Sequence, residues 1–208
     1  TIQTYKTNNL NKFSSIFRYS VLSKNIDVTD TSVLGNLLTL TAKKGLTPSL
    51  TANNSYTISF NNAIYNPSTT YEGAVSTSAF AYTDSTGTTY STSYLDDLNG
   101  VMRIYYYSGS DKLIIANNAG TVAYGNGHIT LTSFKPDSFA GSTLDFTIQP
   151  ATNDLIPVRN QIFTIANTDI TVTMQDDADT GTTTTSASAT GSSDSITTGT
   201  ATGSSTVY

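Results

Sequence analysis

The sequence predicts a mainly β protein, an irregular antiparallel β-sandwich or barrel-like domain, and three observations favour this class. Apolar and polar residues alternate along short segments such as 56–60 and 144–148, which is typical of half-buried strands. Gly, Asn and Pro separate these segments at short intervals, as in sandwiches and barrels. Helix-like spacing of apolar residues is confined to the N-terminal part. Three regions are expected: a connector over 1–35, a β-rich domain over 36–177 and an extended arm over 178–208.

The connector, residues 1–35, is predicted to be irregular or extended with at most a short helix. Phe13, Ile16, Phe17 and Val21 recur at helical spacing, but the stretch is short and weakly charged. Residues 32–43 are ambiguous between strand and helix, and threonines at alternate positions near the end of this stretch favour a strand.

The β-rich domain is expected to contain short strands joined by turns. Residues 74–84 and 88–95 flank Asp-Ser-Thr-Gly-Thr, which predicts a hairpin with Gly87 in its turn. Further turns are expected at 117–120 and 125–127. The remaining predicted strands are 55–60, 101–107, 112–116, 121–124, 128–134, 144–150, 157–165 and 169–175, with Ile129, Leu131, Leu144, Phe146 and Ile148 facing inward.

The arm, residues 178–208, is rich in Thr, Ser and Gly, and its only large apolar side chains are Ile196, Val207 and Tyr208. Such a segment cannot bury enough surface to offset an ordering entropy of about 1–2 kcal/mol per residue. We therefore expect neighbouring subunits to order it, through addition of Thr-rich strands to exposed sheet edges. The alternative is a flexible linker or a mucin-like stalk.

Composition excludes several classes of partner. Charged residues make up 12% of the chain, about half the usual share, which suits a surface packed against other subunits. The net charge of −5 and the isoelectric point near 4.5 argue against nucleic acid. Apolar runs fall short of the ~18 residues that span a bilayer, so no membrane insertion is expected. The sequence contains no cysteine and begins at Thr1 without a signal peptide; we expect it to be a piece of a longer protein.

The sequence carries no motif for catalysis or cofactor binding, so we expect no enzyme, no cofactor and no small-molecule substrate. Gly-x-Ser-x-Gly, the phosphate-binding loop and His-Glu-x-x-His are all missing. The single histidine, His128, follows a Gly-Asn-Gly turn at the head of a predicted strand and is interpreted as an ordinary surface or turn residue.

Acidic pairs and tyrosines offer weaker signals. Asp96-Asp97 and Asp176-Asp177 are interpreted as solvated turns. The second pair, with Asp179, mimics the start of a calcium loop but lacks EF-hand spacing. A built calcium site is therefore not expected at 176–179, and any calcium bound there would be adventitious. The run 105–107 contains three tyrosines that could line a sugar-binding surface, but alternate residues of a strand face opposite ways, so one or two are expected in the core.

Of the three arginines, Arg18 and Arg159 lie among apolar or aromatic residues, whereas Arg103 lies in a predicted strand. A buried guanidinium needs a carboxylate or carbonyl partner. For Arg18 and Arg159, a contact with another subunit and an internal brace are weighted equally.

Four segments carry a resemblance to a known family: SIFRYSVLSKNIDVTD (15–30), FNNAIYNP (60–67), TIQPATNDLIPVRNQIFTI (147–165) and DITVTMQDD (169–177). In order and spacing they resemble the C-terminal region of the large baseplate wedge protein of T4-like contractile-tailed bacteriophages, from about Phe13 to Asp177. That family pairs copies within each wedge and closes wedges into a ring around the central hub. It has no catalytic residues, so none are implied here. The family's N-terminal helical clamp is not represented, and the Thr/Ser/Gly arm does not map onto the family.

The resemblance implies a structural wedge subunit of a phage tail baseplate. Its partners would be copies of itself and other baseplate or tail proteins, and its location the virion, after assembly in the host cytoplasm. The residues expected to make contacts are Phe17, Arg18, Tyr19, Pro157, Arg159, Gln161, Val207 and Tyr208.

Two other functions stay open. The Tyr-rich strands are compatible with a receptor- or glycan-binding tail module, an adhesin-like β domain. A third, weaker alternative is an accessory domain of a secreted hydrolase, which would require a signal peptide in the full-length gene.

Overall fold

The structure is a computed structural model that describes residues 1–157, 161–175 and 187–190, the last four by their backbone alone. Two compact units divide the chain, residues 1–163 and 164–208. The chain is mainly β, and the principal sheet of the first unit is antiparallel and nearly closed into a barrel. The predicted fold class is therefore confirmed.

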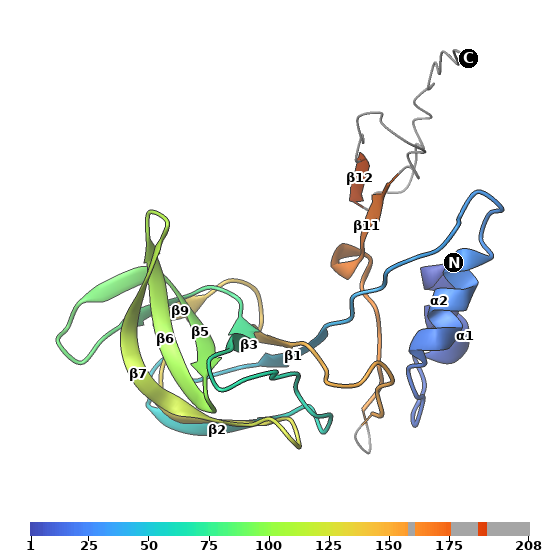
Figure 1. The fold of residues 1–208 in the computed structure, drawn as a ribbon. Coiled ribbons are helices and arrows are strands. Elements are labelled where there is room, and N and C mark those ends of the chain that lie inside the picture. Colours follow the sequence, from blue (N-terminus) through green and yellow to red (C-terminus); the bar gives the residue numbers. More distant parts are fainter. Residues whose placement is uncertain (158–160, 176–186, 191–208) are drawn as a thin grey trace, which may run out of the picture. The chain divides into compact units, whose positions relative to one another are not determined.

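The principal sheet contains ten strands within the described residues (Figure 1). Its main path runs β1-β10-β3-β5-β6-β7-β8-β2, and β4 and β9 extend from β5 outside this path. The strands are β1 (Ala42–Leu46), β2 (Asn54–Ser59), β3 (Glu72–Thr77), β4 (Phe80–Thr83), β5 (Thr89–Leu98), β6 (Val101–Ser108), β7 (Asp111–Ala123), β8 (His128–Phe134), β9 (Ser138–Phe139) and β10 (Leu144–Ile148).

Tight turns set the register of the central strands. Asn99 and Gly100 join β5 to β6 with φ of 49° and 79°, the left-handed pair that a two-residue hairpin requires and that Asn-Gly adopts readily. Gly87, with φ of 89°, lies in the turn between β4 and β5, which confirms the predicted hairpin. Because the Asn99-Gly100 turn matches the twist of the strands, β5 and β6 pair as an antiparallel hairpin. β7 then pairs with β6, with two register shifts.

The two end strands of the path, β1 and β2, are linked by a side chain. Lys44 Nζ on β1 donates a 2.9 Å hydrogen bond to the carbonyl oxygen of Ser59 on β2. The nearly closed sheet is thereby joined across its seam by a lysine.

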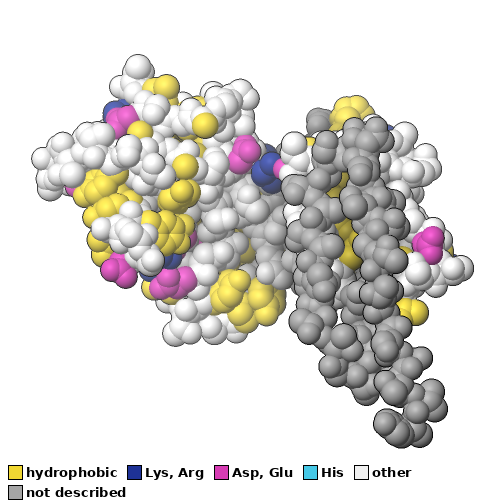
Figure 2. All heavy atoms as spheres, turned by 90° about the horizontal axis from the view of Figure 1, so that it is seen from above, with side chains coloured by type: hydrophobic (Ala, Val, Ile, Leu, Met, Phe, Trp, Pro, Cys, Tyr) yellow, Lys and Arg dark blue, Asp and Glu magenta, His cyan; other side chains and the backbone are white. Residues whose placement is uncertain are grey.

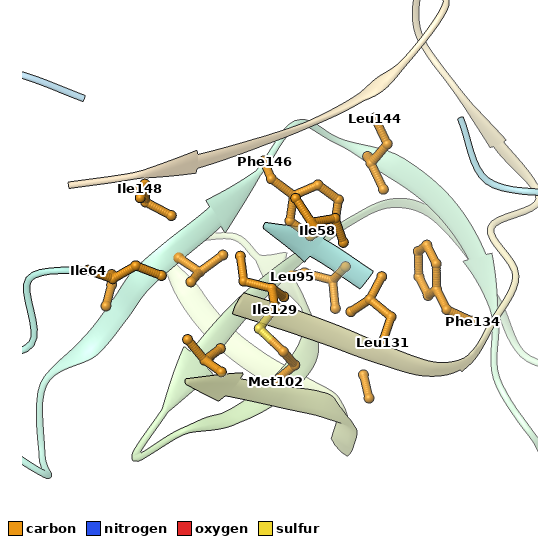
Figure 3. Packing of buried hydrophobic residues seen from close by; sticks show 14 of the residues in the cluster. Ile58, Ile64, Leu95, Met102, Ile129, Leu131, Phe134, Leu144, Phe146 and Ile148 are labelled. Atoms are coloured by element: carbon orange, nitrogen blue, oxygen red, sulfur yellow. The ribbon is translucent and has the colours of Figure 1, made fainter. Parts of the chain in front are cut away.

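The core lies inside this sheet. Figure 3 shows side chains from several strands converging, among them Ile58, Leu95 and Phe146. The five residues predicted to face inward are all at most 1% exposed: Ile129, Leu131, Leu144, Phe146 and Ile148. Period-two alternation thus identified the buried face of β8 and β10 correctly.

The N-terminal part contains two short helices, α1 (Ile2–Asn9) and α2 (Tyr19–Asp27). Phe13 and Ile16 were expected on a helical face, but they lie between the helices and are 66% and 38% exposed. Asn11 and Ser14 adopt φ of 56° and 61°, which interrupts a helix. The helical spacing of residues 13–21 therefore identified the helical region correctly, but the helices lie at 2–9 and 19–27.

Three further predictions need correction. The turn expected at 117–120 lies inside β7, which pairs with both β6 and β8. A Cβ on Gly120 would lie 1.9 Å from the carbonyl oxygen of Thr130, so this glycine permits close approach of β8. The strand expected over 32–43 is paired only from Ala42. Residues 161–165 of the strand expected over 157–165 form no regular structure, because alternation alone supplies no pairing partner.

The second unit contains a 3₁₀ turn, η1 (Asn167–Asp169), and a two-stranded antiparallel sheet of β11 (Thr171–Met174) and β12 (Ala187–Thr190). The strand predicted over 169–175 is confirmed. Most of the predicted arm lies outside the described residues; its described part, β12, pairs with β11 of the same chain. Among the described helices, none is long and apolar enough to cross a membrane.

Candidate assembly surface

The N-terminal module, which we define as residues 1–41 with 151–157 and 161–163, is held together by contacts distant in sequence. Phe17 and Leu155 form an antiparallel bridge with N–H···O distances of 2.9 and 3.1 Å. Tyr5 packs edge-on against Phe17 at 5.8 Å between ring centroids. The Tyr5 hydroxyl accepts a hydrogen bond from the Arg18 backbone N–H and donates one to the Arg18 carbonyl. The first helix is thereby fastened to the segment that precedes the second.

Asp154 fixes the beginning of α2. Its Oδ2 lies 3.1 Å from Arg18 Nη1, and its Oδ1 accepts a 3.0 Å hydrogen bond from the Tyr19 backbone N–H. Arg18, the N-cap residue, makes no side-chain capping bond, so a carboxylate from a distant segment satisfies one of the free donors of the helix and complements the helix dipole. Arg18 therefore has an ion-pair partner within its own chain, while its side chain remains 56% exposed.

Exposed apolar side chains are concentrated on this module. It carries eight of the fifteen large hydrophobic residues that are exposed within the described part of the chain. Leu37 and Leu34 are 94% and 79% exposed, so the described chain leaves these two apolar side chains almost uncovered. Exposed apolar side chains gathered in one region make it a candidate protein interaction site. The eight residues are Phe13, Ile16, Val21, Val28, Leu34, Leu37, Ile156 and Ile162.

Charge is sparse on the molecular surface. The described part of the face seen in Figure 2 is mainly white, which marks uncharged polar side chains and backbone, with some yellow apolar patches; its few acidic and basic groups form small spots, several of which adjoin. Among the described residues on this face, no large cluster of charges of one sign is visible.

A second surface feature is a tyrosine cluster on the outer face of the sheet. Tyr94 on β5 stacks on Tyr105 on β6 at 5.5 Å, and Tyr107 meets both rings edge-on. Lys112 Nζ lies 4.6 Å from the Tyr105 ring centroid, a cation–π contact. Tyr106 packs instead against Tyr90 at 4.7 Å. Tyr105 and Tyr107 therefore lie on one face, and Tyr106 contacts a different ring. The expectation that one or two of these tyrosines belong to the core is wrong, because Tyr105 and Tyr106 are only half-buried, Tyr107 is exposed, and the core cluster contains none of the three.

An ion network adjoins the tyrosine cluster. Asp96 on β5 accepts hydrogen bonds from Arg103 Nε and Nη2 at 3.1 and 2.6 Å and also from Lys112. Glu72 lies 3.1 Å from Arg103 and 3.0 Å from Lys112. Hydrogen bonds from Arg103 and Lys112 lower the pKa of Glu72. Burial lowers the pKa of Arg103, but its hydrogen bonds to Asp96 and Glu72 raise it more, so the guanidinium stays charged.

Asp97 faces the opposite way and is completely buried. It accepts hydrogen bonds from the Val75 N–H at 2.6 Å and from the Tyr124 hydroxyl at 2.5 Å. Burial raises the pKa of the Asp97 carboxyl. Burial and the bond to Asp97 raise the pKa of Tyr124 to about 12. The pair links β3, β5 and the turn after β7; Asp97 is buried, whereas Tyr124 is half-buried.

The predicted contact residues divide into three groups. Phe17, Arg18 and Tyr19 come together at Asp154 and Leu155, with Phe17 only 3% exposed. Pro157 and Gln161 are half-buried in the same module. Arg159, Val207 and Tyr208 lie outside the described residues, as do the acidic residues at 176–179. A contact role for these eight residues stays a prediction.

The prediction for the first acidic pair, Asp96-Asp97, is wrong. Asp96 and Asp97 were interpreted as solvated turns, but they lie in β5 at 2% and 0% exposure. Their partners Arg103, Lys112 and Tyr124 are on other strands or turns, so only the register of the sheet brings them together. The apolar character of the strand around Asp96 and Asp97 was the available signal. Within the described residues, no three His, Cys, Asp or Glu side chains form a group that could hold a metal.

Comparison with known families adds a match at the N-terminus. Residues 1–44, of 208 in all, match the model of the family described as baseplate structural protein gp6, C-terminal domain III. No curated protein matches the chain in sequence. The matched residues include α1, α2 and the first of the four segments that carry the resemblance (15–30), while the other three segments lie beyond them. The match supports a relation to T4-like baseplate proteins over this fifth of the chain.

Proposed function

We propose that this protein is a structural wedge subunit of a phage tail baseplate and that its N-terminal module makes contacts between subunits. The observation that carries the proposal is a coincidence of two features. The residues that match the baseplate family, 1–44, also contain six of the fifteen exposed large apolar side chains of the described residues.

The barrel supplies a different property, which is rigidity. Its core is continuous and its turns are tight, so it can act as a fixed body while the module contacts neighbours. The low charge of the chain suits permanent burial against other subunits. In this proposal the partners are copies of the chain and other baseplate or tail proteins in the virion, and the protein performs no catalysis.

Charge-introducing variants test the proposal. Val28→Asp and Leu34→Asp place a carboxylate on the exposed apolar surface of the module, and Leu50→Asp and Leu113→Asp do so at exposed positions of the barrel, where the side chains are 45% and 41% exposed. We expect the module variants to be lost from purified phage particles and the barrel variants to be incorporated. Equal incorporation of all four folded variants would contradict the proposal.

A glycan-binding tail module is the second candidate, and the tyrosine cluster favours it. The cluster offers limited free ring surface, because Tyr105 is covered by Tyr94 on one side and contacted by Lys112. Tyr107 is the most accessible ring at 53% exposure. A glycan array with the wild-type chain and Tyr107→Ala separates the two functions: binding that depends on Tyr107 supports an adhesin, and absence of binding supports the wedge subunit.

A further inference from the structure

Residues 36–41 are arranged as a strand but lack a strand partner. From residue 36 to residue 46 half-buried and exposed positions alternate without interruption, which is the signature of extended backbone with one face against its own chain. Pairing begins only at Ala42, where β1 joins β10. Figure 1 shows the preceding residues as an extended connection from α2 to β1.

The backbone of this segment is available for pairing. No backbone hydrogen bond to or from residues 36–41 is found in the described chain. Asn36 is attached through its side chain, which donates to the Ser23 carbonyl at 3.0 Å and to Asp27 at 2.6 Å. Leu37, next to it, is 94% exposed. An extended segment with free N–H and C=O groups and an exposed leucine is a template for strand addition.

The second unit contains a sheet that lacks a third strand in the described residues. Its sheet has only two strands, β11 and β12, in the described residues. A two-stranded sheet is marginally stable in water, and three strands with an apolar face are the usual minimum. All residues of β11 are exposed, including Val172 at 43% and Met174 at 67%. This sheet gains stability from a third strand.

Residues 36–41 are compatible with β12 in charge, and they resemble β11, the strand that already pairs with β12, in sequence. Residues 36–41 and β12 both lack charged side chains, so pairing them brings no like charges together. β12 already pairs with Thr-Val-Thr-Met of β11, and residues 38–41 repeat this alternation as Leu-Thr-Leu-Thr. Because each copy carries both elements, pairing between copies can propagate head to tail and close into a ring.

We infer that residues 36–41 of one copy pair with β12 of a second copy, which forms a three-stranded sheet across the subunit boundary. This inference deepens the proposed function and rests on it, because it assigns one of the subunit contacts to a specific pair of strands.

Cysteine cross-linking tests the pairing in the full chain. The sequence has no native cysteine, so Thr39→Cys in one copy and Ser188→Cys in a differently tagged copy provide the only thiols. After mixing and treatment with a short bismaleimide, we expect a cross-linked heterodimer. The matched control combines Ser188→Cys with Thr51→Cys, an exposed loop position of the barrel, and should give none.

A proline variant tests the backbone contribution. In chains that carry Thr41→Cys, adding Thr39→Pro removes one N–H from residues 36–41 and should lower the heterodimer yield with Ser188→Cys by roughly fivefold. Ser85→Pro, at the second position of the turn closed by the Gly87 N–H to Asp84 bond, tolerates proline and should leave the yield unchanged.

A chain that carries both Thr39→Cys and Ser188→Cys is treated in parallel. Three results would overturn the inference: no cross-link above the Thr51→Cys control, cross-links only between two Thr39→Cys copies, or cross-links of the doubly substituted chain that form only within one molecule. If any of these occurs while Val28→Asp and Leu34→Asp still prevent incorporation into particles, the strand pairing is wrong and the proposed function stands. If those variants also incorporate normally, both fail.

Discussion

Asp97 and Tyr124 share a 2.5 Å hydrogen bond inside the barrel, between strand β5 and the turn after β7. Asp97 Oδ1 also accepts the Val75 N–H, and the Tyr124 hydroxyl accepts the Gly100 N–H at 2.7 Å. Four segments of the barrel therefore meet at one buried carboxyl group. Removal of such a contact between strands should therefore lower the free energy of unfolding of the barrel.

Asp97→Asn should flatten the pH dependence of stability. Burial raises the pKa of Asp97 above its unfolded value of 3.8, so its contribution to stability is fully present below about pH 4 and is lost as the pH rises through the folded pKa. Wild-type minus Asp97→Asn free energy of unfolding, from urea titrations between pH 4 and 8, should therefore fall with increasing pH. If the difference in free energy of unfolding were constant, or increased with pH, burial would not destabilise the ionised Asp97 carboxylate.

Asp97→Ala serves as the control for hydrogen bonding. It leaves the Val75 N–H and the Tyr124 hydroxyl without their acceptor, at a cost of about 1–3 kcal/mol for each unsatisfied group. We expect this variant to be less stable than Asp97→Asn at every pH in the same titration.

Asp96→Ala should destabilise the protein far more than Glu72→Ala. Arg103 is 7% exposed, and removal of its buried partner leaves the half-exposed Glu72 as its remaining partner. Breaking a buried ion pair in this way costs about 3–5 kcal/mol. The Glu72 side chain is 48% exposed, so its ion pairs are worth about 1 kcal/mol or less. Urea unfolding at pH 7 measures both; equal losses would mean that solvent reaches Arg103 as freely as Glu72.

Gly127→Ala should cost much more than Gly73→Ala. Both glycines have left-handed φ, 68° and 73°, so both variants incur about 1–2 kcal/mol of backbone strain. In addition, a Cβ on Gly127 would lie 2.2 Å from the Asn62 carbonyl oxygen, whereas nothing lies within 4 Å of one on Gly73. The difference between the two midpoints of thermal unfolding isolates the steric clash, and similar midpoints would refute the close contact.

Asp154→Ala should weaken α2 more than Arg18→Ala does. The exposed ion pair itself contributes about 0.2–1 kcal/mol, but Asp154 also accepts the Tyr19 N–H at the helix N-terminus, where loss of a capping group costs about 1 kcal/mol more. Amide hydrogen exchange in α2 should accelerate more in Asp154→Ala. Equal acceleration in both variants would mean that Asp154 acts only through Arg18.

The sequence predicted those parts of the fold that depend on local pattern. Alternation located β8 and β10 together with their buried faces, and Gly87 marked its turn correctly. The local sequence pattern gave a wrong secondary structure where pairing with neighbouring strands determines the conformation. Asn117 to Gly120 have a typical turn composition, yet both neighbouring strands hold them in β7, and Gly120 is needed for the approach of Thr130.

The candidate site shows the same division. Phe17, Arg18 and Tyr19 were singled out from their sequence context, but their partner Asp154 is more than a hundred residues away and has no local signal. Asp96 and Asp97 looked like a solvated turn because their partners Arg103, Lys112 and Tyr124 are brought to them only by the register of the sheet. The exposure of Leu34 and Leu37 likewise follows from what the folded chain leaves uncovered.

The central claim is that the N-terminal module becomes buried when this protein assembles with other baseplate subunits. Hydroxyl-radical footprinting of the free chain and of purified particles measures this directly, because Leu34, Leu37 and Val28 are highly exposed in the free chain. The account predicts strong protection of these three residues in particles, with Leu113 of the barrel as the comparison. Unchanged labelling of all three in particles would contradict it.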